Sequence, residues 1–242
     1  MRKYYYDLHT HSCLSPCGDA DSTPASIAGM AKLAGLDIIA LTDHNSSKNC
    51  PAFFEAARAY GIIPIAGMEL TTSEDIHAVC LFEELDDAMR FDEFVDSHRM
   101  QIDNRPEIFG EQLILDADDN AIGSVDKLLT VATDISIDDA RSVVEGFGGV
   151  CYPAHIDRDA NGIIAVLGTL PPDTDFTWFE IRDGERREEF ASRYGIDKDR
   201  FIISSDAHYL EGLKDKENFL MLDCAGDDEK AVRKALFELL RR

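Results

Sequence analysis

The chain has 242 residues, 45% of them hydrophobic, which suffices for one large α/β domain or two small ones; one domain is the simpler interpretation. Its formal net charge of -23 argues against double-stranded nucleic acid as a partner, because binding to phosphate backbones relies on Lys and Arg. The sequence has no run of 18 apolar residues and no signal-peptide pattern, so we predict a cytoplasmic protein without a membrane partner. The oligomeric state stays unknown at this point.

Short apolar runs alternate with helix-like segments, which is typical of a mostly parallel sheet covered by helices. The first helix is expected at 23–35, where Thr23 can cap it, Pro24 occupies the first turn and Gly35 ends it. The predicted strands are 4–9, 37–42, 62–67, 77–82, 150–153, 177–181 and 201–205, and an eighth extended run is 219–223.

The alternation breaks between residues 100 and 149, which we interpret as an insertion with a cap-like character. It is expected to hold a hairpin at 113–122 and two helix-like stretches, the second starting at the capping pair Ser136 and Asp139. A C-terminal helix is expected from about Asp227. Its predicted apolar stripe is Ala231, Ala235, Leu236, Leu239 and Leu240.

The six cysteines contain no Cys-x-x-Cys pair and are spread through a chain large enough not to need disulfides. We therefore expect reduced thiols. Three of them, Cys80, Cys151 and Cys224, are expected in the core.

Histidines and carboxylates recur at the ends of the predicted strands. In barrels of parallel strands, functional groups gather at the carboxyl ends, so these side chains are expected to converge. Only His77 differs, because it opens its strand. The candidate residues are His9, His11, Asp43, His44, Glu69, His77, His155, Asp206 and His208.

The residue types in this set point to a metal site. Alternate residues of an extended segment point the same way, so His9 and His11 can reach one ion. Glu69 and Asp206 add oxygen ligands, and a carboxylate can bridge two ions. Mixed nitrogen and oxygen ligands favour zinc, manganese or iron over calcium.

The candidate residues lie in the motifs Asp7-Leu8-His9-Thr10-His11-Ser12, Leu41-Thr42-Asp43-His44-Asn45, Gly67-Met68-Glu69, His77, Pro153-Ala154-His155 and Ser204-Ser205-Asp206-Ala207-His208. In order and spacing, these motifs resemble the PHP (polymerase and histidinol phosphatase) domain family. The resemblance implies that residues 1–242 form a single distorted seven-stranded (β/α)7 TIM-like barrel domain, with the 100–149 insertion inside it. It also implies two or three divalent transition-metal ions that activate a water for phosphoester hydrolysis.

The resemblance further suggests how the ligands are divided. One ion would be held by His9, His11, Glu69 and Asp206, a second by Glu69, His77 and His155, and a third by His44, His208 and an acid near residue 19. Glu69 would bridge two ions, and the attacking water would be held by Glu69, Asp206 and His208. Asp43 would either ligate or orient a neighbouring ligand.

The loop after the His-x-His motif departs from the family, which commonly has Ser-Asp-Gly there. Here the text is Ser15-Pro16-Cys17-Gly18-Asp19, and counting back from Thr23 places Asp19 at the expected carboxylate position. Cys17 is the alternative, since a thiolate would favour zinc at the third site.

Two arginines are candidates for substrate binding. Arg158 and Arg182 lie in loops on the expected active face, where a bidentate guanidinium would suit a phosphate; surface ion pairs with nearby acids are the alternative. We therefore expect a metal-dependent phosphoric ester hydrolase acting on a small phosphorylated metabolite or nucleotide. A histidinol-phosphate phosphatase, a nuclease-like protein and a non-catalytic metal-binding module are the competing interpretations.

Overall fold

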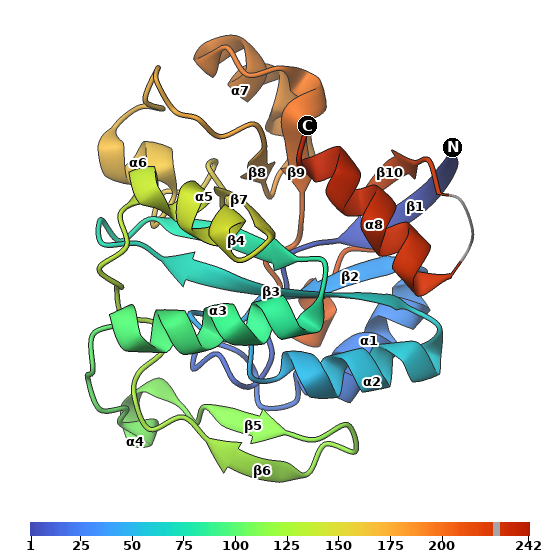
Figure 1. Ribbon diagram of the computed structural model, residues 1–242, viewed down its shortest axis with the longest axis vertical. Helices are drawn as coiled ribbons and strands as arrows, with labels where there is room; N and C mark the ends of the chain where they lie inside the picture. The colour runs from blue at the N-terminus through green and yellow to red at the C-terminus, as the bar shows by residue number, and fades with distance from the viewer. Residues whose placement is uncertain (225–227) are drawn as a thin grey trace.

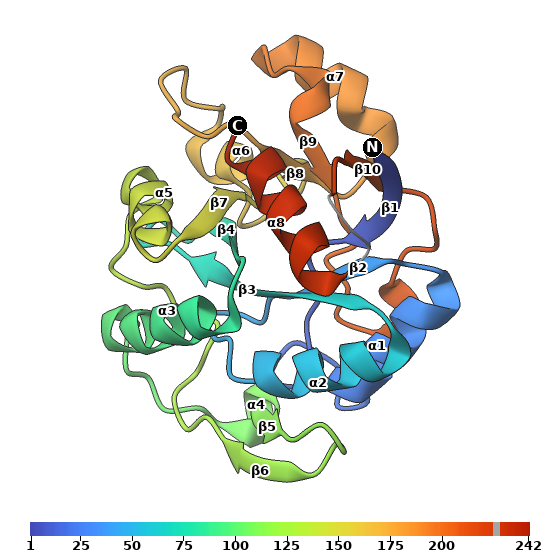
Figure 2. The ribbon, with the colours of Figure 1, turned by 45° about the vertical axis from the view of Figure 1, so that its right-hand side comes forward.

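The computed structural model describes residues 1–224 and 228–242, which form a curled sheet with helices on both faces (Figures 1 and 2). The strands are β1 (Arg2–Asp7), β2 (Ile38–Leu41), β3 (Ile63–Thr71), β4 (His77–Phe82), β5 (Leu113–Leu115), β6 (Ala121–Ser124), β7 (Gly149–Pro153), β8 (Phe179–Ile181), β9 (Phe201–Ile203) and β10 (Phe219–Leu222). The α-helices are α1 (Pro24–Ala34), α2 (Cys50–Tyr60), α3 (Leu85–His98), α4 (Pro106–Phe109), α5 (Ile137–Gly146), α6 (Ile163–Leu167), α7 (Arg187–Tyr194) and α8 (Glu229–Leu240).

The main sheet has the strand order β10-β1-β2-β3-β4-β7, and β8 and β9 form a separate parallel pair. The prediction of a mostly parallel sheet is wrong, because β10, β4 and β7 each pair with their neighbours in antiparallel fashion. The direction of β4 follows from its short connection to β3. Residues 72–76 are too few for the crossover that a parallel strand needs, so β3 and β4 form a hairpin. The fold is therefore mixed α/β with a half-barrel sheet, and a seven-stranded count is not confirmed.

Hydrogen bonds connect the β8–β9 pair to both sides of the main sheet. Near β1, the backbone N–H of Ser205 donates to Asp7 Oδ1 at 3.1 Å. Near β7, the backbone N–H of Ile156 donates to the carbonyl oxygen of Glu180 at 2.8 Å. These bonds bring the loops after β7 and β9 next to the end of β1, although no strand ladder joins them in the part of the chain that the structure describes.

The predicted signals for helix ends are confirmed at α1 and α5. The Thr23 side chain accepts a hydrogen bond from Ser26 N, and Gly35 ends α1 with a positive φ of 75°. Ser136 likewise accepts from the backbone N–H of Asp139 at the start of α5.

Within the predicted insertion, the β5–β6 hairpin lies at one edge of the molecule (Figure 1). Asn49 attaches it to the main body: its side-chain N–H donates to Leu113 O at 3.1 Å, and its oxygen accepts from Leu115 N at 3.0 Å. The rest of the segment includes α5, which packs against β7.

The C-terminal helix α8 covers one face of the sheet. Its predicted start at Asp227 lies outside the described residues, and Asp228 caps the helix that begins at Glu229. Val232 and Phe237 are buried whereas the predicted Ala231 and Leu239 are only half-buried, so the stripe is rotated from the one we expected. The larger side chains at 232 and 237 fill the space beside the sheet.

All six cysteines are free, as predicted. Cys80 and Cys151 are buried on neighbouring strands, but Cys224 is only half-buried, at the edge of the core rather than inside it. None of the helices within residues 1–224 and 228–242 is long and apolar enough to cross a membrane.

We expect Phe237→Ala to lower the free energy of unfolding by about 3–5 kcal/mol, because it empties a fully buried site between α8 and the sheet. Chemical denaturation measures this change. Leu33→Ala on α1 is the control: Leu33 is 81% exposed, so its truncation should change stability by less than about 0.5 kcal/mol. Equal losses for both variants would contradict the packing of α8.

Candidate metal centre

The centre of the site is the Glu69 carboxylate, which is fully buried near the end of β3. One of its oxygens, Oε1, lies 2.8 Å from His77 Nδ1, 2.9 Å from His155 Nε2 and 3.4 Å from His9 Nε2. Residues from β4 and from the loops after β1 and β7 therefore meet at a single oxygen atom.

The second oxygen, Oε2, faces two further histidines. It lies 3.0 Å from His44 Nδ1 and 3.2 Å from His11 Nε2. His11 Nε2 is in turn 3.3 Å from Asp206 Oδ1. The carboxylate of Asp206 therefore also lies beside the His-x-His motif.

The antiparallel strands explain why His77 reaches this site from the start of its strand. In the β3–β4 hairpin, His77 pairs with Thr71, two residues beyond Glu69. In the β4–β7 pair, Ala78 is opposite Pro153, so His155 emerges beside His77. The first residue of an antiparallel strand lies at the same edge as the last residue of its neighbour, which brings all these groups together.

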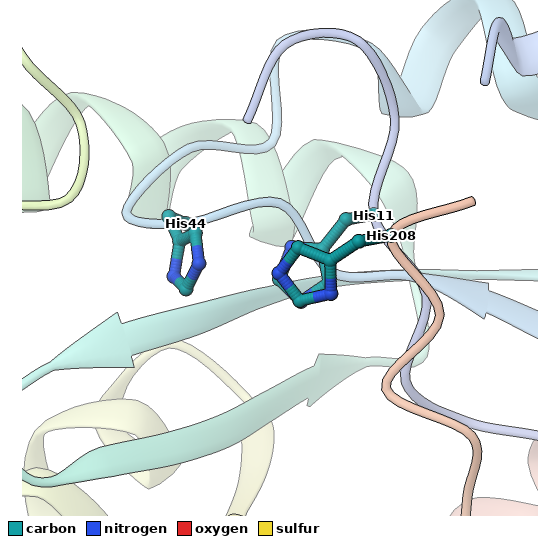
Figure 3. Close-up of side chains that lie close together, drawn as sticks. All are labelled: His11, His44 and His208. Carbon is teal, nitrogen blue, oxygen red and sulfur yellow. The ribbon is translucent and has the colours of Figure 1, made fainter. Parts of the chain in front are cut away.

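The described residues contain three groups of side chains whose ligand atoms all lie within 4.8 Å of one another. Figure 3 shows the third group, in which the His11 and His208 rings stack with centroids 4.2 Å apart and His44 lies beside them. The groups are His9, His11, Glu69 and Asp206; His44, Glu69 and His77; and His11, His44 and His208.

Orphaned polar atoms show that this arrangement fits a bound cation. Glu69 Oε2, Asp206 Oδ1 and His44 Nδ1 are all buried and have no hydrogen-bond partner. Buried polar atoms are normally satisfied, so three such atoms facing one site indicate a missing positive partner. Imidazole nitrogens and carboxylate oxygens are suitable ligands for zinc, manganese or iron.

The electrostatics of the cluster also fit a bound cation. Burial alone would raise the pKa of Glu69, but the charges of His77 and His9 outweigh it and hold that pKa well below its usual range. Burial alone would lower the pKa of His11, but the carboxylates of Asp206 and Glu69 beside it raise that pKa to about 9. The carboxylates are thus ionised and matched by protons on imidazoles, which an entering metal ion would have to displace.

Two site residues have strained backbones. His155 has a φ of 27° and Asp206 a φ of 53°, a region that residues other than glycine seldom adopt. Such strain persists only where surrounding contacts enforce it, and it is typical of functional sites.

Asp43 contacts the loop that follows His11. Its Oδ1 accepts from the backbone N–H of Ser12 and from Ser15 Oγ, both at 2.7 Å, and its Oδ2 accepts from Ser12 Oγ at 2.7 Å. Because Ser15 donates its proton to Asp43, it can only accept from His11 Nδ1, 3.1 Å away. Asp43 belongs to none of the three groups, so these contacts favour the orienting alternative.

Asp19 and Cys17, the alternatives for the third site, lie outside the three groups in the described residues. The backbone N–H of Asp19 donates to His208 O at 2.9 Å, while its carboxylate accepts from the backbone N–H of Asp21. Cys17 is exposed and lines a pocket beside His208. That Asp19 completes the third site, with Cys17 as the alternative, stays a prediction.

That pocket, about 300 Å³ in volume, lies beside the candidate metal centre. It is lined by both predicted substrate-binding arginines as well as by Asp206 and His208. Arg158 lies 2.9 Å and Arg182 3.8 Å from Asp206 Oδ2. The structure therefore brings both guanidiniums to the candidate site while also pairing them with an acid.

One buried acid of the site was missed by sequence reasoning. Glu180 is fully buried in β8, and its Oε1 accepts from His9 Nδ1 at 2.8 Å. The only signal in the sequence was a single carboxylate inside the apolar run 176–181, which could equally have belonged to the surface face of a strand.

The geometry and the motifs define a protein of the PHP type, and the family comparison agrees. The model of the PHP domain matches residues 7–149, which is more than half of the chain. The chain belongs to the PHP domain family.

Three known proteins illustrate the similarity. The error-prone DNA polymerase of Nocardia farcinica is 40% identical over 67 residues, or 28% of this chain and 6% of the polymerase. The lesion-specific endonuclease Q of Pyrococcus furiosus shares the fold, with a TM-score of 0.65 and 15% identity over 98% of this chain and 56% of the endonuclease. A proposed metal-dependent phosphoesterase of Bifidobacterium adolescentis has a TM-score of 0.56 and 18% identity, over 96% of this chain and 95% of that protein.

The prediction that excluded double-stranded nucleic acid is contradicted by these likenesses. A structure of endonuclease Q bound to a 27-mer duplex with an abasic lesion shares the fold with a TM-score of 0.60 over 98% of this chain. A net charge of -23 therefore does not exclude such a partner. The reason is that net charge averages over the surface, whereas recognition depends on the local field.

We expect Glu69→Gln to weaken zinc binding by more than about a hundredfold, because Glu69 faces five imidazoles and is a proposed ligand itself. Mutating a residue that only supports a metal ligand already weakens metal binding by up to about a hundredfold. Competition with a chromophoric chelator measures the affinity. Asp19→Asn should cost less, since Asp19 lies outside the three candidate groups. Glu55→Gln on the exposed face of α2 is the matched control and should bind zinc like the wild type.

Proposed function

We propose that this protein is a metal-dependent phosphoric ester hydrolase acting on a small phosphorylated metabolite or nucleotide. The observation that carries the proposal is the buried Glu69 carboxylate within 3.4 Å of five imidazoles from four parts of the chain. The pocket beside it holds two guanidiniums and is of a size for a small phosphorylated group.

The proposed ligand sets are those expected from the motifs. Divalent zinc, manganese or iron ions held there would supply Lewis acidity and lower the pKa of water. Two or three ions would be held by His9, His11, Glu69 and Asp206; by Glu69, His77 and His155; and by His44 and His208 with Asp19 or Cys17, with Asp43 orienting the first set.

Residues of the chain would bind and orient the substrate. Arg158 and Arg182 would bind phosphoryl oxygens, because their guanidinium groups are partly exposed in the pocket and suit bidentate contacts. His208 Nδ1 donates to the carbonyl oxygen of Asp206 at 2.9 Å, which leaves its Nε2 free. The burial of the other histidines excludes bulk water from the remainder of the site.

We also propose that residues 1–242 are a single PHP-type unit and that residues 100–149 are an insertion supporting the metal loops. Asn45, next to His44, donates to Leu129 O at 2.7 Å and to Val131 O at 2.9 Å. Its backbone has a positive φ of 46°, so the insertion stabilises an otherwise unfavourable turn beside a candidate ligand.

A nuclease-like activity is the second candidate. It is favoured by the likeness to endonuclease Q, one structure of which contains duplex DNA with an abasic lesion. The histidinol-phosphate phosphatase differs in substrate alone. The non-catalytic module is disfavoured because the four ligands proposed for the first ion, His9, His11, Glu69 and Asp206, lie close together.

Turnover by protein loaded with zinc, manganese or iron tests the proposal. The substrates are nucleoside monophosphates, nucleoside 3′,5′-bisphosphates, histidinol phosphate, short single strands and a duplex with an abasic site, at matched ionic strength. We expect hydrolysis of the small phosphoesters, abolished by chelation and restored by metal. A preference for the single-stranded or the duplex DNA would contradict the assignment of a small substrate. Absence of turnover with all three metals would contradict the proposal that the protein is an enzyme.

We expect Arg158→Ala and Arg182→Ala each to raise KM roughly tenfold, the low end for a charge-assisted hydrogen bond, since both side chains are partly exposed. Steady-state kinetics on the best substrate measures the change. Arg90→Ala serves as the control, because Arg90 pairs with Asp87 on α3. Unchanged KM values would favour the simple ion-pair interpretation of both arginines.

A further inference from the structure

The Glu180 carboxylate joins two candidate ligands that come from different strands. Its Oε1 accepts a hydrogen bond from His9 Nδ1 at 2.8 Å and another from the backbone N–H of His155 at 3.0 Å. His9 follows β1 and His155 follows β7, so a single oxygen on β8 spans the opening between the two sides of the sheet.

Toward His9, this contact sets the direction of the ring. An ionised carboxylate only accepts hydrogen bonds, so Nδ1 must carry a proton, and a neutral His9 then presents the lone pair of Nε2. Nε2 lies 3.4 Å from Glu69 Oε1 and 3.5 Å from Asp206 Oδ1, on the side of the candidate cluster.

Toward His155, the contact fixes the main chain. The φ of 27° turns this residue out of the extended conformation, and Glu180 holds its N–H in that turn. The turn places His155 Nε2 at 2.9 Å from Glu69 Oε1. The rings of His9 and His155 are stacked with centroids 5.8 Å apart, so the two contacts fix neighbouring imidazoles.

A purely structural role does not account for a charge at this position. Glu180 is fully buried, and its second oxygen, Oε2, has no hydrogen-bond partner. A buried carboxylate that is only half satisfied is unfavourable for folding, and a glutamine could accept the same two hydrogen bonds without the charge. The charge is useful if His9 has to be held in one tautomer and made a more basic ligand.

We propose that Glu180 is a positioning residue for the metal centre: it fixes the His9 tautomer and the His155 turn together, and so holds the two candidate ligands on either side of Glu69. The inference rests on the metal binding of the proposed function. It assigns a role to a residue outside the proposed ligand set. Glu180 would act through His9 and His155 and not by contact with the ion or the substrate.

The test compares Glu180→Gln with Glu180→Leu in the full chain. We expect Glu180→Gln to leave the Tm of the metal-free protein nearly unchanged and to weaken zinc binding by about 10- to 100-fold, as for other partners of ligand histidines. Glu180→Leu should lower both. The matched control is Glu188→Gln, an exposed acid paired with Lys198, which should change neither.

Zinc competition with a chromophoric chelator gives the affinities, and ¹⁵N NMR of the zinc-loaded wild type gives the His9 tautomer, expected with its proton on Nδ1. Zinc binding by Glu180→Gln at wild-type strength would overturn the proposal, as would a proton on Nε2 in the wild type. Equal loss of Tm in Glu180→Gln and Glu180→Leu would also overturn it, because Glu180 would then be structural. A wild-type protein that binds no zinc, manganese or iron would instead contradict the proposed function, and with it this inference.

Discussion

The structure depends on one buried charge. The carboxylate of Glu69 is inaccessible to water, and five imidazoles lie within 3.4 Å of it. An ionised group in such a place is strongly unfavourable unless positive charge surrounds it, as protons on histidines or as bound cations. The folded state must therefore bring histidines from β4 and from the loops after β1, β2 and β7 to the same point.

The sheet topology meets this requirement without a regular barrel. Because β4 is antiparallel to β3, it begins with His77 at the edge where Glu69 lies. Because β7 is antiparallel to β4, it carries the chain back to that edge and to His155. The short parallel pair β8–β9 then joins both sides of the sheet through side chains such as Asp7 and Glu180, and within the described residues no strand ladder joins them. Polar groups that close the fold thus lie directly beside the candidate ligands.

What the sequence could predict was mostly local. Thr23 and Gly35 act within one helical turn, and the His-x-His spacing fixes which way two rings point, so these features were correct from the pattern alone. Strand direction is not local: a buried strand is an apolar run whether its neighbour is parallel or antiparallel, and the direction of β4 follows from pairing. Glu180 was missed for the same reason, since its partners lie 25 and 171 residues away.

The arginines show why the overall charge was a poor guide to partners. Asp206 divides its two oxygens: Oδ1 faces His9 and His11, and Oδ2 faces Arg158 and Arg182. One carboxylate thereby links the candidate metal cluster to the two cations of the pocket. A phosphate entering the pocket would meet those cations and any bound ions, whatever the charge of the distant surface, because nearby charges in a partly buried site are screened least. Discrimination between a small phosphoester and a DNA backbone would then come from the shape of the pocket, which Cys17 and Tyr209 also line, and not from the net charge of the chain.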